Sequence, residues 1–227
     1  MMGSQSSGIL KEQPGTEVPL EAIIDEQPET GTLSLNKSSP SPLKCLKTAD
    51  KFVVDASNWR YDIYDRNGEL MYSGYEESSL CQECCCCSHR SFVVYIKNKH
   101  GKRVMQITRP SECCRGGQSC TIKVSPGMEI GTVTLRHFWC SKRCDVEDAD
   151  GNVLLKIDQP RGVACGSMVY FPVRTMFGNR VADIKKYGAL GGKTTFSVKF
   201  PIDLKMETKA LILGALIFLD ITNFELQ

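Results

Sequence analysis

The sequence predicts a mainly β domain that begins near residue 52 and ends on a buried helix. Two observations support this prediction. From Phe52 onward, short β-like apolar runs alternate with glycine-containing turns, a spacing typical of all-β sandwiches and barrels. Near the end, Ala210–Leu219 is one uninterrupted apolar run of helix-forming residues, which is typical of a helix enclosed by protein.

Five hairpins account for the β-like part of the chain. In each, two runs rich in β-branched and aromatic residues flank a turn with glycine, which supplies the positive φ that tight turns need. Asp65, Asn98 and Asp148 begin three of these turns, because their side chains bond to the local backbone. The expected strand pairs are residues 61–64 with 69–72, 92–96 with 102–107, 121–124 with 132–135, 144–147 with 152–157 and 168–171 with 180–184.

The apolar run near the C-terminus is too short to cross a bilayer. Its ten residues compare with the roughly 20 that a spanning helix needs. Lys209 and Asp220 bracket the run, and both charges would be costly in hydrocarbon. We therefore expect a helix buried inside the domain, with a membrane-inserted helix as the alternative. The residues concerned are Ala210, Leu211, Ile212, Leu213, Gly214, Ala215, Leu216, Ile217, Phe218 and Leu219.

Residues 1–50 differ from the rest in composition and charge. They are rich in Ser, Pro, Glu and Gly, which predicts a disordered or weakly ordered N-terminal segment ahead of a folded domain at 51–227. The segment has a net charge of −3 and the domain a net charge of +5. A mildly basic domain suits an anionic membrane surface, whereas the total of +2 is too small to predict nucleic-acid binding.

Twelve cysteines are many for a chain of 227 residues. The first residues contain neither a basic n-region nor an apolar h-region, so we expect a reducing compartment in which disulfides are uncommon. Acylation, zinc binding and unmodified thiols all remain open. Cys81 with Cys84, and Cys84 with Cys87, have the spacing of zinc ligands, but four consecutive cysteines cannot all face one tetrahedral centre, so no metal site is firm. The two clusters are Cys81, Cys84, Cys85, Cys86 and Cys87, then Cys113, Cys114 and Cys120.

Motifs of the common enzyme classes are missing from the sequence. Its three histidines are His89, His100 and His137. No nucleophile elbow, P-loop or dinucleotide-binding fingerprint occurs. We therefore expect a protein that is not an enzyme.

Several blocks between residues 52 and 225 resemble the phospholipid scramblases. The strongest is Phe196–Glu225, which contains Phe-Pro-Ile-Asp-Leu, then Lys-Ala ahead of a Gly-Ala apolar helix, then Asp and a Phe-Glu ending. Further similarities are Pro126-Gly-Met-Glu-Ile-Gly131, Arg136-His-Phe-Trp139 and Ile107-Thr-Arg-Pro110. Together these blocks are specific, whereas any one alone is weak.

The resemblance implies both a fold and a role. The implied fold is the tubby-like closed β-barrel of about 12 strands around a central hydrophobic C-terminal helix. The implied function is ATP-independent, bidirectional movement of phospholipids between leaflets, activated by calcium, at the cytosolic face of the plasma membrane. The implied partner is the phospholipid membrane with its anionic cytosolic leaflet, and protein partners would bind the N-terminal segment. A membrane-tethered adaptor module that binds lipid headgroups or proteins without scrambling is the alternative.

Two sites follow from the resemblance. A palmitoylated cluster corresponds to Cys113, Cys114 and Cys120, although it has fewer cysteines here than in the family, and Cys84 to Cys87 are further acylation candidates. A calcium segment corresponds to residues 192–203, but only Asp203 keeps a carboxylate there, next to two lysines. Calcium takes six to eight oxygen ligands, several of them charged. We therefore expect Asp203 to bind calcium weakly, and to act first as a cap before the last helix.

Overall fold

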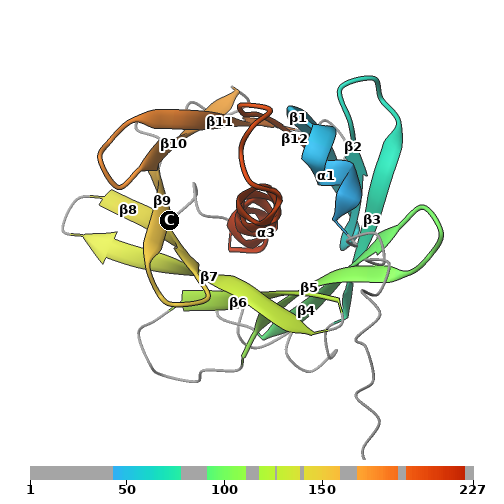
Figure 1. Ribbon diagram of the computed structural model, residues 1–227, viewed down its shortest axis with the longest axis horizontal. Helices are drawn as coiled ribbons and strands as arrows, with labels where there is room; N and C mark the ends of the chain where they lie inside the picture. Colours follow the sequence, from blue (N-terminus) through green and yellow to red (C-terminus); the bar gives the residue numbers. More distant parts are fainter. Residues whose placement is uncertain are drawn as a thin grey trace, which may run out of the picture. The chain divides into compact units, whose positions relative to one another are not determined.

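Twelve antiparallel strands close into a barrel around one helix (Figure 1). The computed structural model describes residues 43–77, 91–110, 118–125, 127–138, 141–158, 168–188 and 193–222. Each strand pairs with its neighbours in the sequence, and β1 (Lys51–Ser57) pairs with β12 (Thr194–Lys199) to close the ring. This confirms the predicted closed β-barrel of about 12 strands around a C-terminal helix.

The five predicted hairpins are all present, and every strand except β9 is longer than the sequence indicated. At the turn between β4 and β5, the side-chain oxygen of Asn98 accepts hydrogen bonds from the backbone N–H groups of His100 and Lys102, and Gly101 adopts φ +75°. The hairpins are β2 (Arg60–Tyr64) with β3 (Leu70–Glu77), β4 (Phe92–Asn98) with β5 (Arg103–Arg109), β6 (Gln118–Val124) with β7 (Met128–Phe138), β8 (Ser141–Asp148) with β9 (Val153–Asp158), and β10 (Val169–Thr175) with β11 (Arg180–Tyr187).

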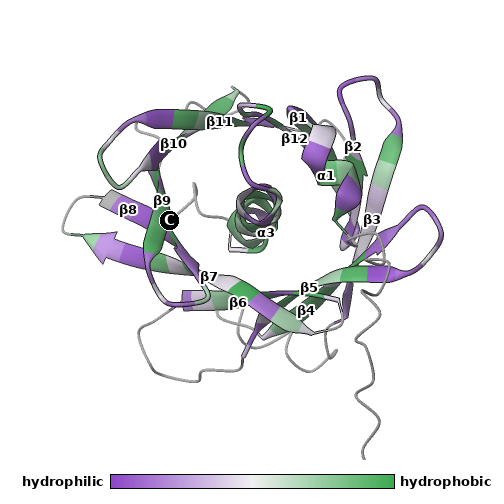
Figure 2. Ribbon diagram, viewed as in Figure 1, coloured by the Kyte–Doolittle hydropathy of each residue, from purple (hydrophilic) through white to green (hydrophobic). Residues whose placement is uncertain are grey.

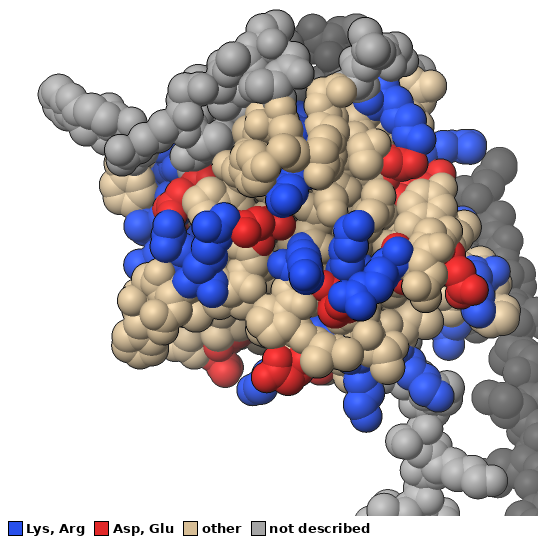
Figure 3. Space-filling model, turned by 90° about the horizontal axis from the view of Figure 1, so that it is seen from above, with Lys and Arg blue, Asp and Glu red and all other residues tan. Residues whose placement is uncertain are grey.

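Side chains alternate between the barrel interior and its outer wall, as the period of two in a strand requires. In β1, Phe52, Val54 and Ala56 are buried, and Val54 lies opposite the equally buried Phe196 of β12. The outer wall is polar. Figure 3 views it over β10, β11, β12 and β1 and shows groups of Lys and Arg side chains among fewer acidic ones.

The helix α3 (Met206–Ile221) fills the interior of the barrel. Every residue from Ala210 to Leu219 is buried, so the prediction of a helix inside the domain is confirmed. Figure 2 shows this helix as a hydrophobic ribbon at the centre of the barrel. Among the described residues, no helix combines the length and the apolar character needed to cross a membrane.

A short helix, α1 (Lys44–Thr48), precedes the barrel. It lies within the 50 residues that the sequence assigns to the N-terminal segment, and Leu43 and Leu46 belong to the buried core. In Figure 1, α1 lies between α3 and the strands β1 to β3. The packed structure therefore includes the last part of that segment.

Candidate functional site

Lys209 is a fully buried cation on α3 (0% exposed). Its Nζ donates to the backbone carbonyl oxygens of Ala49 at 2.7 Å, Ile202 at 2.8 Å and Leu46 at 3.1 Å. Burial lowers the pKa of this ammonium, and the nearby Asp203 carboxylate partly opposes the shift. Because carbonyl oxygens take the place of water around the charge, Lys209 can remain at the end of an apolar helix and hold α1 against it.

Asp220 is the charged residue at the opposite end of the same helix. Its carboxylate accepts a hydrogen bond from the Tyr61 hydroxyl at 3.4 Å, and its other oxygen lies 3.9 Å from Nζ of Lys186. Tyr61 belongs to β2 and Lys186 to β11. Two strands of the barrel thus bind Asp220, whereas α1 and the turn before α3 bind Lys209, so the helix is held at both ends.

Asp203 lies in the turn between β12 and α3, where its side chain is exposed. The structure brings it to a depression of about 790 Å³ that the turn carrying Asp148 and Asp150 also lines. The Asp148 carboxylate is already engaged, since it accepts the backbone N–H groups of Asn152 at 2.8 Å and Asp150 at 3.0 Å. These hydrogen bonds lower the pKa of Asp148, and the bond from Asn152 has the largest effect. The turn therefore uses this carboxylate for its own structure.

The residues of the implied calcium segment do not fit that ion. Thr194–Lys199 forms strand β12, so consecutive side chains point to opposite faces instead of converging on one centre. Lys193 is paired with Asp55, with 2.7 Å between Nζ and Oδ2. Within the described ranges, no group of three or more His, Cys, Asp and Glu side chains could hold a metal ion. Gly192, at the start of this segment, lies outside the described residues.

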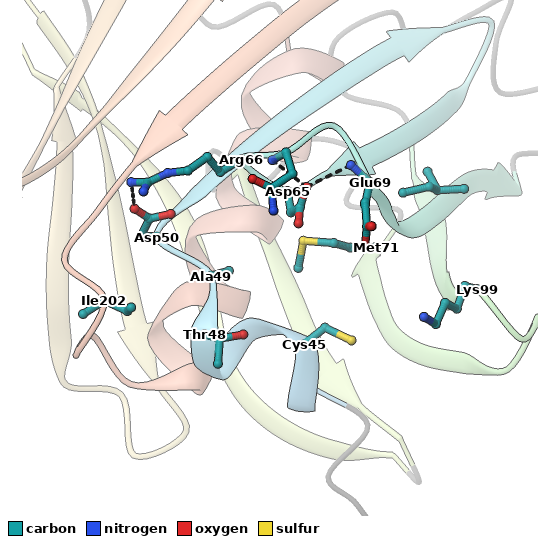
Figure 4. Close-up of a pocket in the computed structure, with 12 residues that line it drawn as sticks. Cys45, Thr48, Ala49, Asp50, Asp65, Arg66, Glu69, Met71, Lys99 and Ile202 are labelled. Carbon is teal, nitrogen blue, oxygen red and sulfur yellow. Dashed lines mark hydrogen bonds and ion pairs between the residues drawn. The ribbon is translucent and has the colours of Figure 1, made fainter.

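A second pocket, of about 560 Å³, lies between α1 and the turn that joins β2 to β3 (Figure 4). Three of its charged side chains are bound to each other or to the backbone. Arg66 pairs with Asp50, and the Asp65 carboxylate accepts the backbone N–H groups of Asn67 and Glu69. The other two charged residues that line the pocket, Glu69 and Lys99, have opposite signs, so the pocket has no strong preference for one sign of ligand charge.

Most of the acylation candidates lie outside the described residues, namely Cys84, Cys85, Cys86, Cys87, Cys113 and Cys114. Cys120 is described, and its side chain is 1% exposed on the inward face of β6. Burial raises the pKa of its thiol to about 12. A buried protonated thiol cannot reach an acyl donor, so Cys120 does not fit the acylation predicted for it. Its place in the sequence, close to Cys113 and Cys114, gave no sign of this burial.

Sequence reasoning missed two sets of residues. It noted Lys209 only as the boundary of an apolar run, because two of its carbonyl partners, Leu46 and Ala49, lie about 160 residues earlier in the chain. It also gave no role to Trp59, which is exposed in the turn between β1 and β2. The signal was present, since Asn58-Trp59 separates two β-like runs and a two-residue turn displays its side chains outward.

The chain is similar to known proteins over most of its length. Its residues 39–226 match the family described as Scramblase. It is 28% identical to phospholipid scramblase 1 of Mus musculus, over 74% of this chain and 56% of that protein. It is 27% identical to phospholipid scramblase 2 of Bos taurus, over 75% of this chain and 62% of that protein. The chain thus spans little more than half the length of these relatives.

A solved structure of a protein from Arabidopsis thaliana is also similar, with a TM-score of 0.49 and 13% identity, covering 82% of this chain and 99% of that one. The family match includes every described strand and both described helices. The resemblance inferred from the sequence motifs is therefore confirmed, and the chain belongs to the scramblase family.

Proposed function

We propose that this protein is a phospholipid scramblase that moves lipids between leaflets in both directions without ATP. The observation that carries the proposal is the family match over residues 39–226. A lipid translocator also agrees with the sequence, which lacks the motifs of the common enzyme classes. Calcium activation is part of the implied function, but the residues around Asp203 do not supply a site for it.

A membrane-tethered adaptor is the second candidate, and the filled barrel favours it. The ten residues from Ala210 to Leu219 are buried, and charged groups at both ends of α3 bind the barrel or α1. A lipid path through this interior would require α3 to leave the barrel and to expose that apolar surface. In water this opening would be strongly unfavourable, because the burial of apolar surface stabilises the folded chain by about 25 cal/mol per Å². A bilayer would have to replace the lost contacts.

For both candidates we propose a place at the cytosolic face of the plasma membrane, on its anionic leaflet. The net charge of +5 on residues 51–227 supports this location. Acylation at Cys84 to Cys87, Cys113 and Cys114 would supply an anchor in addition to electrostatic attraction, since stable attachment takes two signals. Protein partners would bind the N-terminal segment.

Reconstitution separates the two candidates. The purified full-length chain is placed in liposomes that carry a fluorescent lipid in both leaflets, and a membrane-impermeant reductant then bleaches the outer leaflet. Scrambling predicts that the bleached fraction rises from about half to nearly all of the label. An adaptor predicts that the protein binds the liposomes while the inner-leaflet label stays protected.

The matched control is a chain that binds the liposomes but cannot release α3. In this variant, Leu216 of α3 and a core residue that faces it on the barrel wall are both replaced by cysteine. A disulfide between the two cysteines would hold the helix in place. Leaflet exchange that stops on oxidation and returns on reduction would support a mechanism in which α3 moves. Exchange that persists in the oxidised protein would place the lipid path outside the barrel.

A further inference from the structure

The depression beside Asp203 has an apolar floor. Its volume of about 790 Å³ falls within the range of about 300–1,000 Å³ that is typical of ligand sites, which are mostly apolar with a few polar groups. The floor consists of Ile130, Leu154, Leu155, Leu204 and Leu211. Three of these side chains are buried and the other two pack against the core. Because Leu211 belongs to α3, we call this site the α3 depression.

Carboxylates surround the apolar floor. They belong to Glu129, Asp148, Asp150, Asp203 and Glu207. Among the described residues that line the α3 depression, Lys205 alone is basic. Two further ammonium groups lie close by, since Lys123 is opposite Glu129 in the sheet and the buried Lys209 is near Asp203. Even with both included, five carboxylates stand against three ammonium groups, so the depression attracts positive charge.

The carboxylates of the α3 depression do not converge on one point. They come from the start of β7, the turn between β8 and β9, the turn before α3 and the first turn of α3. Over the described ranges, no three of the His, Cys, Asp and Glu side chains are grouped so that they could hold a metal ion. A ligand that pairs with several of these carboxylates therefore needs more than one positive charge, spaced along its length.

We propose that the α3 depression is the docking site for a short segment of a partner protein that carries both large apolar and basic side chains. The apolar side chains would lie on the leucine floor, where burial favours them, and Lys or Arg side chains would face the acidic walls. An acidic segment or an anionic bilayer would be repelled from these walls. The site goes beyond both candidate functions, because it depends neither on leaflet exchange nor on membrane attachment.

A segment in this site would also act on α3. Thr208 and Leu211 line the α3 depression from the helix itself, and Leu204 lines it from the preceding turn. A ligand that contacts these residues binds only the chain that has α3 inside the barrel. Since a ligand that binds the folded state alone raises its stability, the docked segment should raise the unfolding temperature of the chain.

Fluorescence anisotropy with labelled peptides and the full-length chain tests the proposal. The probe is a fluorescein-labelled hexapeptide in which Leu and Lys alternate. A hexapeptide of alternating Leu and Glu reverses the charge, and one of alternating Ser and Lys removes the apolar side chains. Thermal unfolding with the unlabelled Leu/Lys peptide is the second readout.

Two variants of the chain alter the α3 depression at exposed positions. Asp150→Asn/Glu207→Gln removes two wall charges, and Ala149→Arg adds a cation at the edge of the depression. The matched charge control, Glu69→Gln/Glu77→Gln, removes two exposed carboxylates elsewhere. The matched arginine control is Met176→Arg, because Met176 has the same position in the turn between β10 and β11 as Ala149 has between β8 and β9. Circular dichroism verifies that each variant is folded.

We expect the wild-type chain to bind the Leu/Lys peptide and to unfold at a higher temperature in its presence. The Leu/Glu peptide should not bind, and the Ser/Lys peptide should bind at least about fivefold more weakly. Asp150→Asn/Glu207→Gln should weaken binding of the Leu/Lys peptide about threefold, and Ala149→Arg at least about tenfold. Both controls should change it by less than about twofold.

Several outcomes would overturn the proposal. A wild-type chain that does not bind the Leu/Lys peptide would do so, as would equal losses in Ala149→Arg and Met176→Arg. Equal affinity for the Ser/Lys peptide would show general attraction of charge without use of the floor. Displacement of the peptide by an equal concentration of decyltrimethylammonium would assign the depression to a single-headed amphiphile instead. Leaflet exchange is measured separately, so these outcomes leave the proposed lipid movement unaffected.

Discussion

Nζ of Lys209 lies 2.7 Å from the carbonyl oxygen of Ala49, and this hydrogen bond joins the buried helix α3 to the residue that ends α1. The same ammonium also binds the carbonyl oxygens of Leu46 and Ile202. A single side chain thus holds three separate backbone segments together at one end of the barrel. Because the four-carbon stem is buried as well, its packing and its charge both stabilise this end.

Lys209→Met should lower the free energy of unfolding by about 1–3 kcal/mol, because it keeps the apolar stem but leaves buried carbonyl oxygens without a donor. Urea unfolding followed by circular dichroism measures the change. Lys205→Met is the matched control, since Lys205 is exposed at the start of the same helix. Equal stability of the two variants would show that Lys209 does not hold α1 in place.

Gly214 allows α3 to approach the barrel wall closely. A β-carbon at this position would overlap the Ile122 side chain, with Cγ1 only 2.9 Å away. Gly214→Ala should therefore destabilise the domain by about 1–3 kcal/mol, although alanine favours a helix by about 1 kcal/mol over glycine. Adding Ile122→Val removes the closest methyl group and should recover part of the loss. If the two substitutions changed the free energy of unfolding in urea by strictly additive amounts, the contact between Gly214 and Ile122 would be contradicted.

Much of the fold follows from local sequence signals. The five hairpins were predicted because each turn has its glycine within a few residues of the strands it joins, and α3 because its apolar run is uninterrupted. The pairing of β1 with β12 was implied only by the closed barrel of the family resemblance and by no local signal, since Ala56 and Thr194 meet across most of the chain. No local signal placed α1 against Lys209 either, because the two lie about 160 residues apart in the sequence.

The candidate sites were less predictable than the fold. Asp203 was expected to cap the last helix, but the residue at the start of α3 is Lys205 and no side chain caps the helix there. The nearness of Asp203 to the turn of Asp148 depends on the closed barrel. Likewise, the exposed Trp59, Phe138 and Tyr187 lie at one end of the barrel although their strands are distant in sequence. Such a surface has no local signature, because barrel closure alone brings its members together.

Acid should destabilise the pair formed by Asp55 and Lys193. Burial alone would raise the pKa of Asp55, but hydrogen bonds from Lys193 and Thr195 outweigh burial and lower the pKa below 3.8. The pair therefore contributes stability above pH 3.8 that is lost as pH falls through the folded-state pKa. Asp55→Asn should flatten the fall in unfolding free energy between pH 5 and pH 2. Asp150→Asn controls for the loss of one exposed carboxylate, and an equal flattening there would contradict the role of the pair.

Acyl labelling should separate the cysteines by burial. Replacing Cys84 to Cys87 with Ser, or Cys113 and Cys114 with Ser, should reduce hydroxylamine-sensitive palmitate labelling and shift protein from membrane to cytosol. Cys120→Ala should leave the labelling unchanged, because this thiol is buried and its pKa is raised. Labelling lost on Cys120→Ala alone, in a protein that remains folded, would show that β6 opens to the acyl donor.

Calcium is the last prediction, and here we expect this chain to depart from what the family resemblance implies. The segment before Asp203 is largely strand β12, and Lys193 within it is bound to Asp55. Sites that sense calcium bind it at about 10⁻⁷–10⁻⁵ M through several charged oxygen ligands. Isothermal titration calorimetry of the folded chain should therefore show binding no tighter than about 10⁻³ M, near the weak limit of natural sites.

Two variants make the calcium test specific. Asp203→Ala removes the one carboxylate of the implied segment, and Asp150→Ala removes a carboxylate of the neighbouring turn in the same depression. Since neither belongs to a cluster of three ligands within the described ranges, both should leave the heat of titration unchanged. Micromolar binding that disappears in Asp203→Ala would show that the segment does hold calcium. Micromolar binding that disappears only in Asp150→Ala would place the ion at the turn between β8 and β9, with Asp203 outside its ligand shell.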